Sequence, residues 1–288
     1  MIWIVFSFLA ALMATVRVVI EKSLPRTIPA TVVLWFTALF SLPMYAYFAW
    51  RDGFVVSNMW FWPLVIVGSL VGVLAQAMFL VAVQKFEISK VVPLMTLSPL
   101  MLLILETIIF GTLPSLGAVA GIGVLLAGTL YFHWDDESEH TPWDVLRNMW
   151  VERETQVMLG VVFLMALLGI ADKLGSQWSS SGTWLLWAYA WYVVWISGYI
   201  IHRKYSFRTV LQAPKRLAVI TLIQGAVALS ILAAIQYTFV ANVMAIKRLS
   251  VLLTVLYGAM VYKEELARHR FWAAMVMLFG VGLIVYYG

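Results

Sequence analysis

Residues 217–239 read LAVITLIQGAVALSILAAIQYTF, and this run contains no Asp, Glu, Lys or Arg. A helix needs roughly 20 mostly apolar residues to cross a bilayer, and it satisfies its backbone hydrogen bonds internally. The run therefore predicts a transmembrane helix. The whole chain of 288 residues has a similar character, since 63% of its residues are hydrophobic and 11% are charged. This composition excludes a water-soluble globule.

Apolar runs of this kind recur along the chain with short loops between them. They predict ten crossings, at residues 2–20, 30–50, 59–83, 88–110, 115–132, 156–171, 183–201, 217–239, 243–262 and 271–287. The first run leads into Glu21 and Lys22 rather than a small-residue cleavage site, which favours a retained helix over a signal peptide. The predicted fold class is an all-α polytopic membrane protein with ten transmembrane helices.

An acidic segment divides the chain near its middle. Residues 133–155 hold half of all Asp and Glu residues in the sequence. Within this segment, Thr141, Pro142 and Asp144 resemble an N-cap, a first-turn proline and an acidic first turn, which favours a short helix on the membrane surface. A solvated linker is the alternative. The expected division of the chain is a first repeat at 1–133, the acidic linker at 134–155 and a second repeat at 156–288.

The two halves of the sequence resemble each other at an offset of 152 residues, with one match at 151. The matches include Trp35 with Trp187, Gln84 with Gln236, Ser98 with Ser250, Gly128 with Gly280, and Glu21-Lys22 with Asp172-Lys173. Each half holds an odd number of predicted crossings, so the second copy must be inverted relative to the first. Inverted repeats are typical of secondary transporters, whose substrate sites lie near the bilayer midplane between the repeats.

The end of the chain resembles a known family. Residues 241–288 read ANVMAIKRLSVLLTVLYGAMVYKEELARHRFWAAMVMLFGVGLIVYYG. A Lys-Arg pair at a helix start, small residues in the middle, a glutamate at the helix end and a glycine-bearing last helix resemble the C-terminal helix pair of the EamA-type drug/metabolite transporter superfamily. Residues 88–132 are similar around Leu97-Ser98-Pro99 and Gly128. The resemblance implies two inverted five-helix repeats and a secondary transporter, with the family glutamate at Glu264 but Thr112 in the first half.

The orientation in the membrane has two possible answers. Most Lys and Arg residues follow odd-numbered crossings, and the positive-inside rule then places these loops in the cytoplasm and both chain termini outside. The resemblance implies the opposite orientation, with both termini in the cytoplasm. Both alternatives stay open from the sequence alone.

Two cations begin about one turn inside the ninth predicted crossing, at Lys247 and Arg248. Lys247, Ser250, Thr254 and Tyr257 follow at helical spacings of three or four, so they share one face. We expect this face to line a substrate cavity in which Lys247 and Arg248 bind a carboxylate or a phosphate. The resemblance adds that phosphate-handling branches of the superfamily carry Lys-Arg at this point. The alternative is a helix that starts later, with both cations extended toward the interface.

Other polar and aromatic side chains inside the predicted helices complete the candidate substrate site. They are Gln76, Gln224, Ser98, Trp35, Trp187 and Arg17. Amides offer hydrogen bonds to a substrate and indoles can stack on it, although contacts between helices are the alternative use of such residues. Arg17 lies four residues before Glu21, a spacing that favours an ion pair. Glu106 is an isolated acid in an apolar run and is predicted to be the coupling carboxylate, the alternative being an interfacial acid with no specific role.

The sequence also argues against several functions. It has no cysteine, its four histidines are scattered, and it contains no HExxH, GxSxG or Walker motif. We therefore expect no cofactor, no metal, no enzymatic activity and no nucleic-acid partner. The predicted function is gradient-coupled secondary transport of a small polar or anionic metabolite by alternating access. The alternatives are a flippase for a phosphate-bearing lipid carrier and a membrane-embedded enzyme. The expected location is the bacterial cytoplasmic (inner) membrane, as a monomer or homodimer surrounded by lipids.

Overall fold

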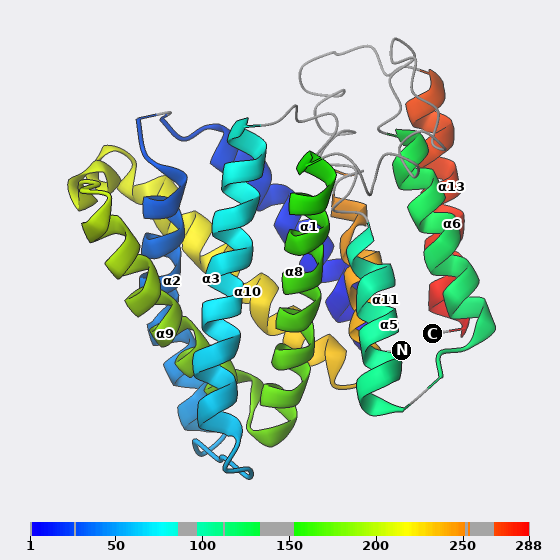
Figure 1. Ribbon diagram of the computed structural model, residues 1–288, viewed down its shortest axis with the longest axis horizontal. Coiled ribbons are helices and arrows are strands. Elements are labelled where there is room, and N and C mark those ends of the chain that lie inside the picture. The colour runs from blue at the N-terminus through cyan, green and yellow to red at the C-terminus, as the bar shows by residue number, and fades with distance from the viewer. Residues whose placement is uncertain are drawn as a thin grey trace. The chain divides into compact units, whose positions relative to one another are not determined.

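The computed structural model describes residues 2–25, 27–85, 97–111, 113–132, 153–250, 253 and 268–287 (Figure 1). The described residues form helices, and their one extended pairing is an isolated bridge between Val56 and Ser179. The helices are α1 (Ile2–Lys22), α2 (Ala30–Arg51), α3 (Phe61–Lys85), α5 (Ser98–Phe110), α6 (Leu116–Phe132), α8 (Arg153–Trp178), α9 (Ser181–His202), the 3-10 helix η2 (Phe207–Gln212), α10 (Pro214–Ile235), α11 (Val240–Lys247) and α13 (Arg268–Tyr287). The predicted all-α class is confirmed.

Six helices in the described part of the chain are long and apolar enough to cross a membrane. They are α1, α2, α3, α8, α9 and α10. Shorter apolar helices lie at Ser98–Phe110, Leu116–Gly128 and Met275–Tyr287. These helices confirm a polytopic membrane protein. The count of ten crossings stays a prediction, because residues 86–96, 251–252 and 254–267 lie outside the described ranges. The predicted surface helix at Thr141 to Asp144 lies outside them as well.

Two predicted crossings differ from the structure by more than four residues at one end. The helix α11 ends at Lys247, so the crossing expected at 243–262 is not one uninterrupted helix. The Arg248 N–H is shared between the carbonyl oxygens of Met244 at 3.2 Å and Ala245 at 3.1 Å, a tightening typical of a helix end. The crossing expected to stop at residue 171 continues to Trp178, and Asp172 in this added stretch accepts a hydrogen bond from Trp184 Nε1 at 2.8 Å.

The helices pack into two compact units, and each unit draws on both halves of the sequence. Unit 1 contains Met1–Val73, Ala171–Tyr237 and Leu253–Val255. In it α1 packs against α10, and α2 packs against α9 (Figure 1). A Cβ on Gly182 would lie 2.6 Å from the Ala49 nitrogen, so the absence of a side chain lets the start of α9 reach the backbone of α2.

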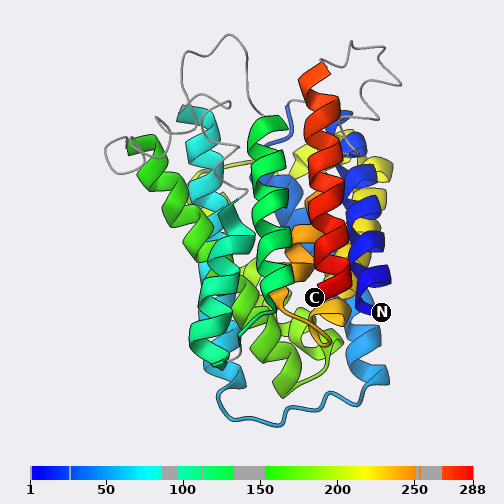
Figure 2. The ribbon, with the colours of Figure 1, turned by 90° about the vertical axis from the view of Figure 1, so that its right-hand side faces the viewer.

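Unit 2 contains Leu74–Ile170, Thr238–Leu252 and Leu256–Gly288. In it α6 packs along α13, as Figure 2 shows, and α5 packs against α11. A Cβ on Gly280 would lie 2.6 Å from the Leu125 nitrogen and 2.8 Å from the Gly121 oxygen, so glycine permits direct backbone approach of α13 to α6. Ala82, Met158 and Val161 form a buried cluster that joins the end of α3 to α8.

Two of these pairs join helices that the sequence offset makes equivalent: α2 with α9 and α6 with α13. The partners α6 and α13 run antiparallel, since Gly128 lies against Met277 while Gly121, about two turns earlier, lies against Ile284. Antiparallel packing of equivalent helices agrees with what an inverted repeat predicts. The repeat boundaries at 133 and 156 stay a prediction, because the two units describe packing rather than internal repetition.

Candidate substrate site

The predicted site residues fall into both units, and each unit is described by itself. Unit 1 holds Arg17, Trp35, Trp187 and Gln224. Unit 2 holds Gln76, Ser98, Glu106, Lys247, Arg248 and Ser250. Thr254 and Tyr257 lie outside the described residues. The predicted stripe that runs from Lys247 to Tyr257 is therefore described only at its first half.

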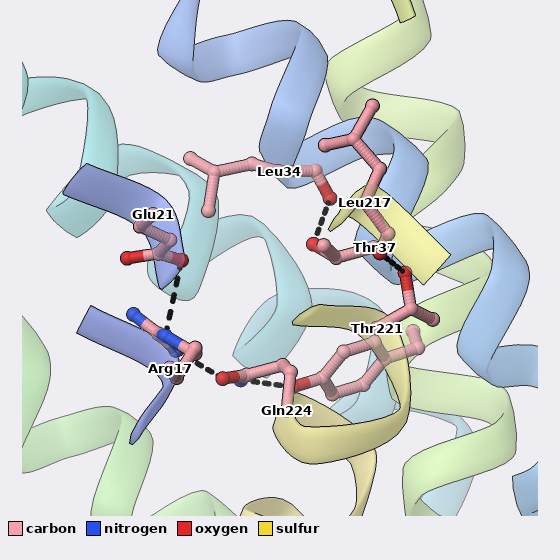
Figure 3. A network of polar contacts seen from close by, with 8 residues as sticks. Arg17, Glu21, Leu34, Thr37, Leu217, Thr221 and Gln224 are labelled. Atoms are coloured by element: carbon pink, nitrogen blue, oxygen red, sulfur yellow. Dashed lines mark hydrogen bonds and ion pairs between the residues drawn. The ribbon is translucent and has the colours of Figure 1, made fainter. Parts of the chain in front are cut away.

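In unit 1, Arg17 lies at the centre of a polar network that joins three helices (Figure 3). Its Nη1 donates a hydrogen bond to Gln224 Oε1 on α10, and Gln224 Nε2 lies 3.3 Å from the Tyr189 hydroxyl on α9. The Nε atom of Arg17 lies 3.1 Å from Glu21 Oε1, which confirms the predicted ion pair. The two predicted site residues Arg17 and Gln224 therefore meet, and their contacts link α1, α10 and α9.

Hydroxyl groups near this network are satisfied within their own helices. Thr37 Oγ1 donates to the Leu34 carbonyl at 3.0 Å, and Thr221 Oγ1 donates to the Leu217 carbonyl at 2.8 Å (Figure 3). Such bonds to a preceding turn are common for threonine in helices. The network around Arg17 is consequently composed of one carboxylate, one amide and one phenol, a set suited to a polar ligand or to fixing three helices together.

The two predicted tryptophans of unit 1 have protein partners. Trp35 Nε1 donates to Ser197 Oγ at 2.8 Å, and its ring lies 4.6 Å from the Phe207 ring. Trp187 is 36% exposed and meets the Trp62 ring edge-on at 5.0 Å between centroids. These contacts favour packing between helices for both side chains, and their proposed stacking on a substrate stays a prediction.

In unit 2, Glu106 is fully buried and binds the start of α11. Its Oε1 accepts a hydrogen bond from the Val240 N–H and its Oε2 accepts one from the Ala241 N–H, each at 2.9 Å. The first N–H groups of a helix have no partner within the helix, and a carboxylate placed there also interacts favourably with the helix dipole. Glu106 therefore has a defined structural role, which neither reading of the sequence anticipated.

The cationic end of α11 contacts another predicted site residue. Arg248 Nη2 donates a hydrogen bond to Ser98 Oγ, at the first residue of α5. Lys247, Arg248 and Ser250 are half-buried, and so is Gln76 on α3. A half-buried guanidinium beside a half-buried ammonium provides many donors for one anionic group. Lys247 and Arg248 lie at the end of α11, and their function as anion ligands stays a prediction.

Sequence reasoning missed several residues that the structure brings into these networks. Tyr189 was not distinguished among the many aromatic residues of α9, because composition alone does not show which ring faces Gln224. Asn242, a buried residue in the first turn of α11, donates a hydrogen bond from Nδ2 to Thr238 Oγ1 at 3.0 Å. Asp172 could have been found, since it matches Glu21 in the repeat alignment and lies inside an apolar run.

Comparison with solved structures covers the whole chain, and comparison with family models covers its first half. Among solved structures, 28 chains match. One is a crystal structure of a protein that is 14% identical, covers 99% of this chain and 97% of its own, and has a TM-score of 0.74. At this identity the likeness shows the fold alone. The comparison with curated proteins gives no match.

The family comparison is more specific about the kind of protein. Residues 1–133 match the model of the EamA-like transporter family. This segment corresponds to the predicted first repeat and contains Arg17, Trp35, Gln76, Ser98 and Glu106. The family consists of membrane transporters rather than enzymes. The match confirms the resemblance expected from the sequence, since residues 1–133 are similar to the EamA-like transporter family.

Proposed function

We propose that the protein is a secondary transporter that moves a small polar or anionic metabolite by alternating access across the bacterial cytoplasmic membrane. The family match over residues 1–133 and the six long apolar helices support the transport class. The observation that carries the choice of an anion is the position of Arg248, which ends α11 beside Lys247 and donates to Ser98. A planar guanidinium has five donors and matches the geometry of carboxylate and phosphate oxygens.

The network in unit 1 supports recognition of polar, uncharged groups rather than of the anion. Arg17 already forms an ion pair with Glu21, so its net charge is offset locally. The amide of Gln224 and the hydroxyl of Tyr189 offer both donors and acceptors. In this proposal Arg248 and Lys247 of unit 2 bind the charged part of the substrate, and no anion contact is assigned to Gln224 of unit 1.

Gradient coupling is proposed to act through Glu106. Its carboxylate is held by the Val240 and Ala241 N–H groups, so proton uptake by this carboxylate would weaken its contact with α11. Proton binding at Glu106 would then be coupled to a shift in the position of Lys247 and Arg248 at the end of α11. An intramembrane carboxylate with a named partner is a reasonable place for such a step.

The experiment compares two arginines at helix ends. Purified protein in lipid nanodiscs is titrated with inorganic phosphate, acetate, a polyprenyl phosphate and neutral glycerol, for the native chain, Arg248→Ala and Arg51→Ala. Arg51 is a matched control because it ends α2, is 60% exposed and pairs with Asp52 at 3.2 Å. A desolvated charge contact contributes about 2 to 5 kcal/mol to binding, whereas an exposed pair contributes less than about 1 kcal/mol.

We expect Arg248→Ala to raise the Kd of at least one anion more than tenfold and Arg51→Ala to change it less than fivefold, with little effect on glycerol. If polyprenyl phosphate is the only anion that binds, the lipid-carrier flippase is favoured over the metabolite transporter. Equal losses for the anion and for glycerol, or no binding of any anion, would show that the proposal of an anionic substrate is wrong.

A further inference from the structure

The start of α11 is capped by a side chain from another helix. The N-cap residue Phe239 supplies no side-chain hydrogen bond. The carboxylate of Glu106 on α5 instead accepts the N–H groups of Val240 and Ala241, at 2.9 Å each. The contact is fully buried at Glu106 and at both partner residues. Two otherwise unsatisfied donors of α11 therefore depend on one residue that lies 134 positions earlier in the chain.

The opposite end of α11 is tied to the same helix. Arg248, the C-cap of α11, donates to Ser98 at the start of α5. Glu106 lies eight residues after Ser98, and Arg248 lies eight residues after Val240, so each interval is about 12 Å of helix. The two helices consequently run antiparallel with matched lengths, and a polar contact joins them at each end.

A helix as short as α11 depends on such contacts. It has eight residues, whereas an isolated helix shorter than about 12 residues is marginal in water even with a favourable sequence. The neighbouring helix α8 packs closely against both α5 and α11 at Gly169. A Cβ at this position would lie 2.8 Å from Leu102 Cδ2 and 3.3 Å from Val240 Cγ1. The axial position of α11 is therefore set by α5 and α8, with Glu106 as the polar contact at its start.

We propose that Glu106 is a positioning residue for the cationic end of α11. By holding the Val240 and Ala241 N–H groups, it fixes the register of α11 along α5 and so places Arg248 beside Ser98. Loss of the cap lets α11 shift along α5 and moves Arg248 and Lys247 from the position in which they meet an anion. Only this last consequence rests on the proposed function, because the placement of Arg248 by Glu106 needs no substrate.

The first experiment measures placement without a ligand. The chain has no cysteine, so Ser98→Cys with Arg248→Cys provides a clean pair for a short bifunctional methanethiosulfonate cross-linker. Because this pair removes the Ser98–Arg248 hydrogen bond itself, the cross-linking rate reports how well the remaining contacts, including the cap at Glu106, hold α11 in place. We expect Glu106→Gln to lower the rate at least fivefold and Asp52→Asn, the same change at an exposed ion pair, to leave it unchanged. An unaltered rate in Glu106→Gln overturns the proposal.

A variant that removes the backbone N–H of Val240 tests the same contact from the α11 side. Val240 is the first residue of α11, where proline is tolerated, and Phe239 before it already has the extended geometry that a following proline requires, at φ −64 and ψ 140. Val240→Pro removes one donor to Glu106, while Val240→Ala makes a similar change in side-chain volume and keeps the N–H. We expect slower cross-linking in Val240→Pro than in Val240→Ala. Equal rates overturn the proposal even if Glu106→Gln does not fold.

The second experiment asks whether Glu106 acts through Arg248. Phosphate affinity is measured for the native chain, Glu106→Gln, Arg248→Ala and the double variant. We expect Glu106→Gln to raise the Kd about tenfold in the native background and less than twofold in the Arg248→Ala background, because coupled residues give non-additive effects. Equal losses in both backgrounds overturn the proposal. If Arg248→Ala alone leaves affinity unchanged, the proposed anion site is wrong, and the cross-linking rates still decide the placement.

Discussion

Arg248 donates a hydrogen bond to Ser98, although 150 residues separate them in the sequence. Ser98 begins α5 and Arg248 ends α11, so the contact joins the two segments on which the family resemblance was founded. Both residues had been predicted as site residues on separate grounds, Ser98 from the repeat and Arg248 from its charge in an apolar run. The contact makes α5 and α11 one structural element of the candidate site, and it gives the first prediction a specific target.

Ser98→Ala removes one acceptor of Arg248 and leaves the backbone of α5 unchanged. We expect the free energy of unfolding to fall by about 1 to 3 kcal/mol, as for hydrogen bonds to a charged group, and the phosphate Kd to rise two- to fivefold. Unfolding in mixed micelles and calorimetric titration measure the two effects. Ser23→Ala is the control, since Ser23 is exposed and its hydroxyl bonds only the adjacent Ile20 carbonyl at 2.7 Å. Identical behaviour of the two variants would contradict the assignment.

Gln224→Leu keeps the approximate size of the side chain and removes the link between Arg17 and Tyr189. Both residues then lose a hydrogen-bond partner in a partly buried setting, so we expect a destabilisation of about 1 to 3 kcal/mol. Gln236→Leu, an exposed glutamine directly after the same helix, should change stability by less than about 0.5 kcal/mol. A neutral effect of Gln224→Leu would mean that the network does not hold α1, α10 and α9 together.

Gly280→Ala places a methyl group against the backbone of α6. The new Cβ would lie 2.6 Å from the Leu125 nitrogen, so the two helices must separate, and we expect a loss of about 1 to 3 kcal/mol in unfolding free energy. Gly282→Ala is the matched control on the same helix, because no atom lies within 4 Å of a Cβ there. Thermal unfolding measured for both variants distinguishes close helix packing from a general effect of alanine in α13.

Glu106→Gln should separate driven transport from exchange. A glutamine cannot take up and release a proton, so uptake of phosphate driven by a pH gradient should disappear in proteoliposomes, whereas exchange without a gradient should persist at a raised KM. Glu106→Asp keeps the carboxylate and should retain part of the driven uptake. Driven uptake that is unchanged in Glu106→Gln would show that coupling does not pass through this residue.

Single cysteines at Ser57 and Ser138 test the orientation in the membrane. The charge count predicts that a membrane-impermeant thiol reagent labels the residue-57 cysteine in intact cells and does not label the residue-138 cysteine. The family resemblance predicts the reverse. Ser57 is exposed between α2 and α3, and the native chain contributes no thiol of its own. The labelling pattern decides between the two orientations, since only one of the two positions is then on the outer side.

The sequence by itself determined the class of fold. Long apolar runs such as 217–239 have one stable solution in a bilayer, a helix that satisfies its own backbone, and this local requirement made α10 and most other helices predictable. The family resemblance was also carried by local features. The ion pair between Arg17 and Glu21 followed from their spacing of four residues on one helix.

Tertiary structure decided which polar groups meet. The pattern around Glu106 indicated an unusual acid but could not reveal that its partners are the N–H groups of Val240 and Ala241, because these donors become available only where α11 begins. That start follows the turn after α10, and α11 ends at Lys247, where its C-cap Arg248 meets α5. Contacts across 134 or 150 residues require helices to be placed beside one another, and apolar periodicity carries little information about such placement in a chain that is hydrophobic on all sides.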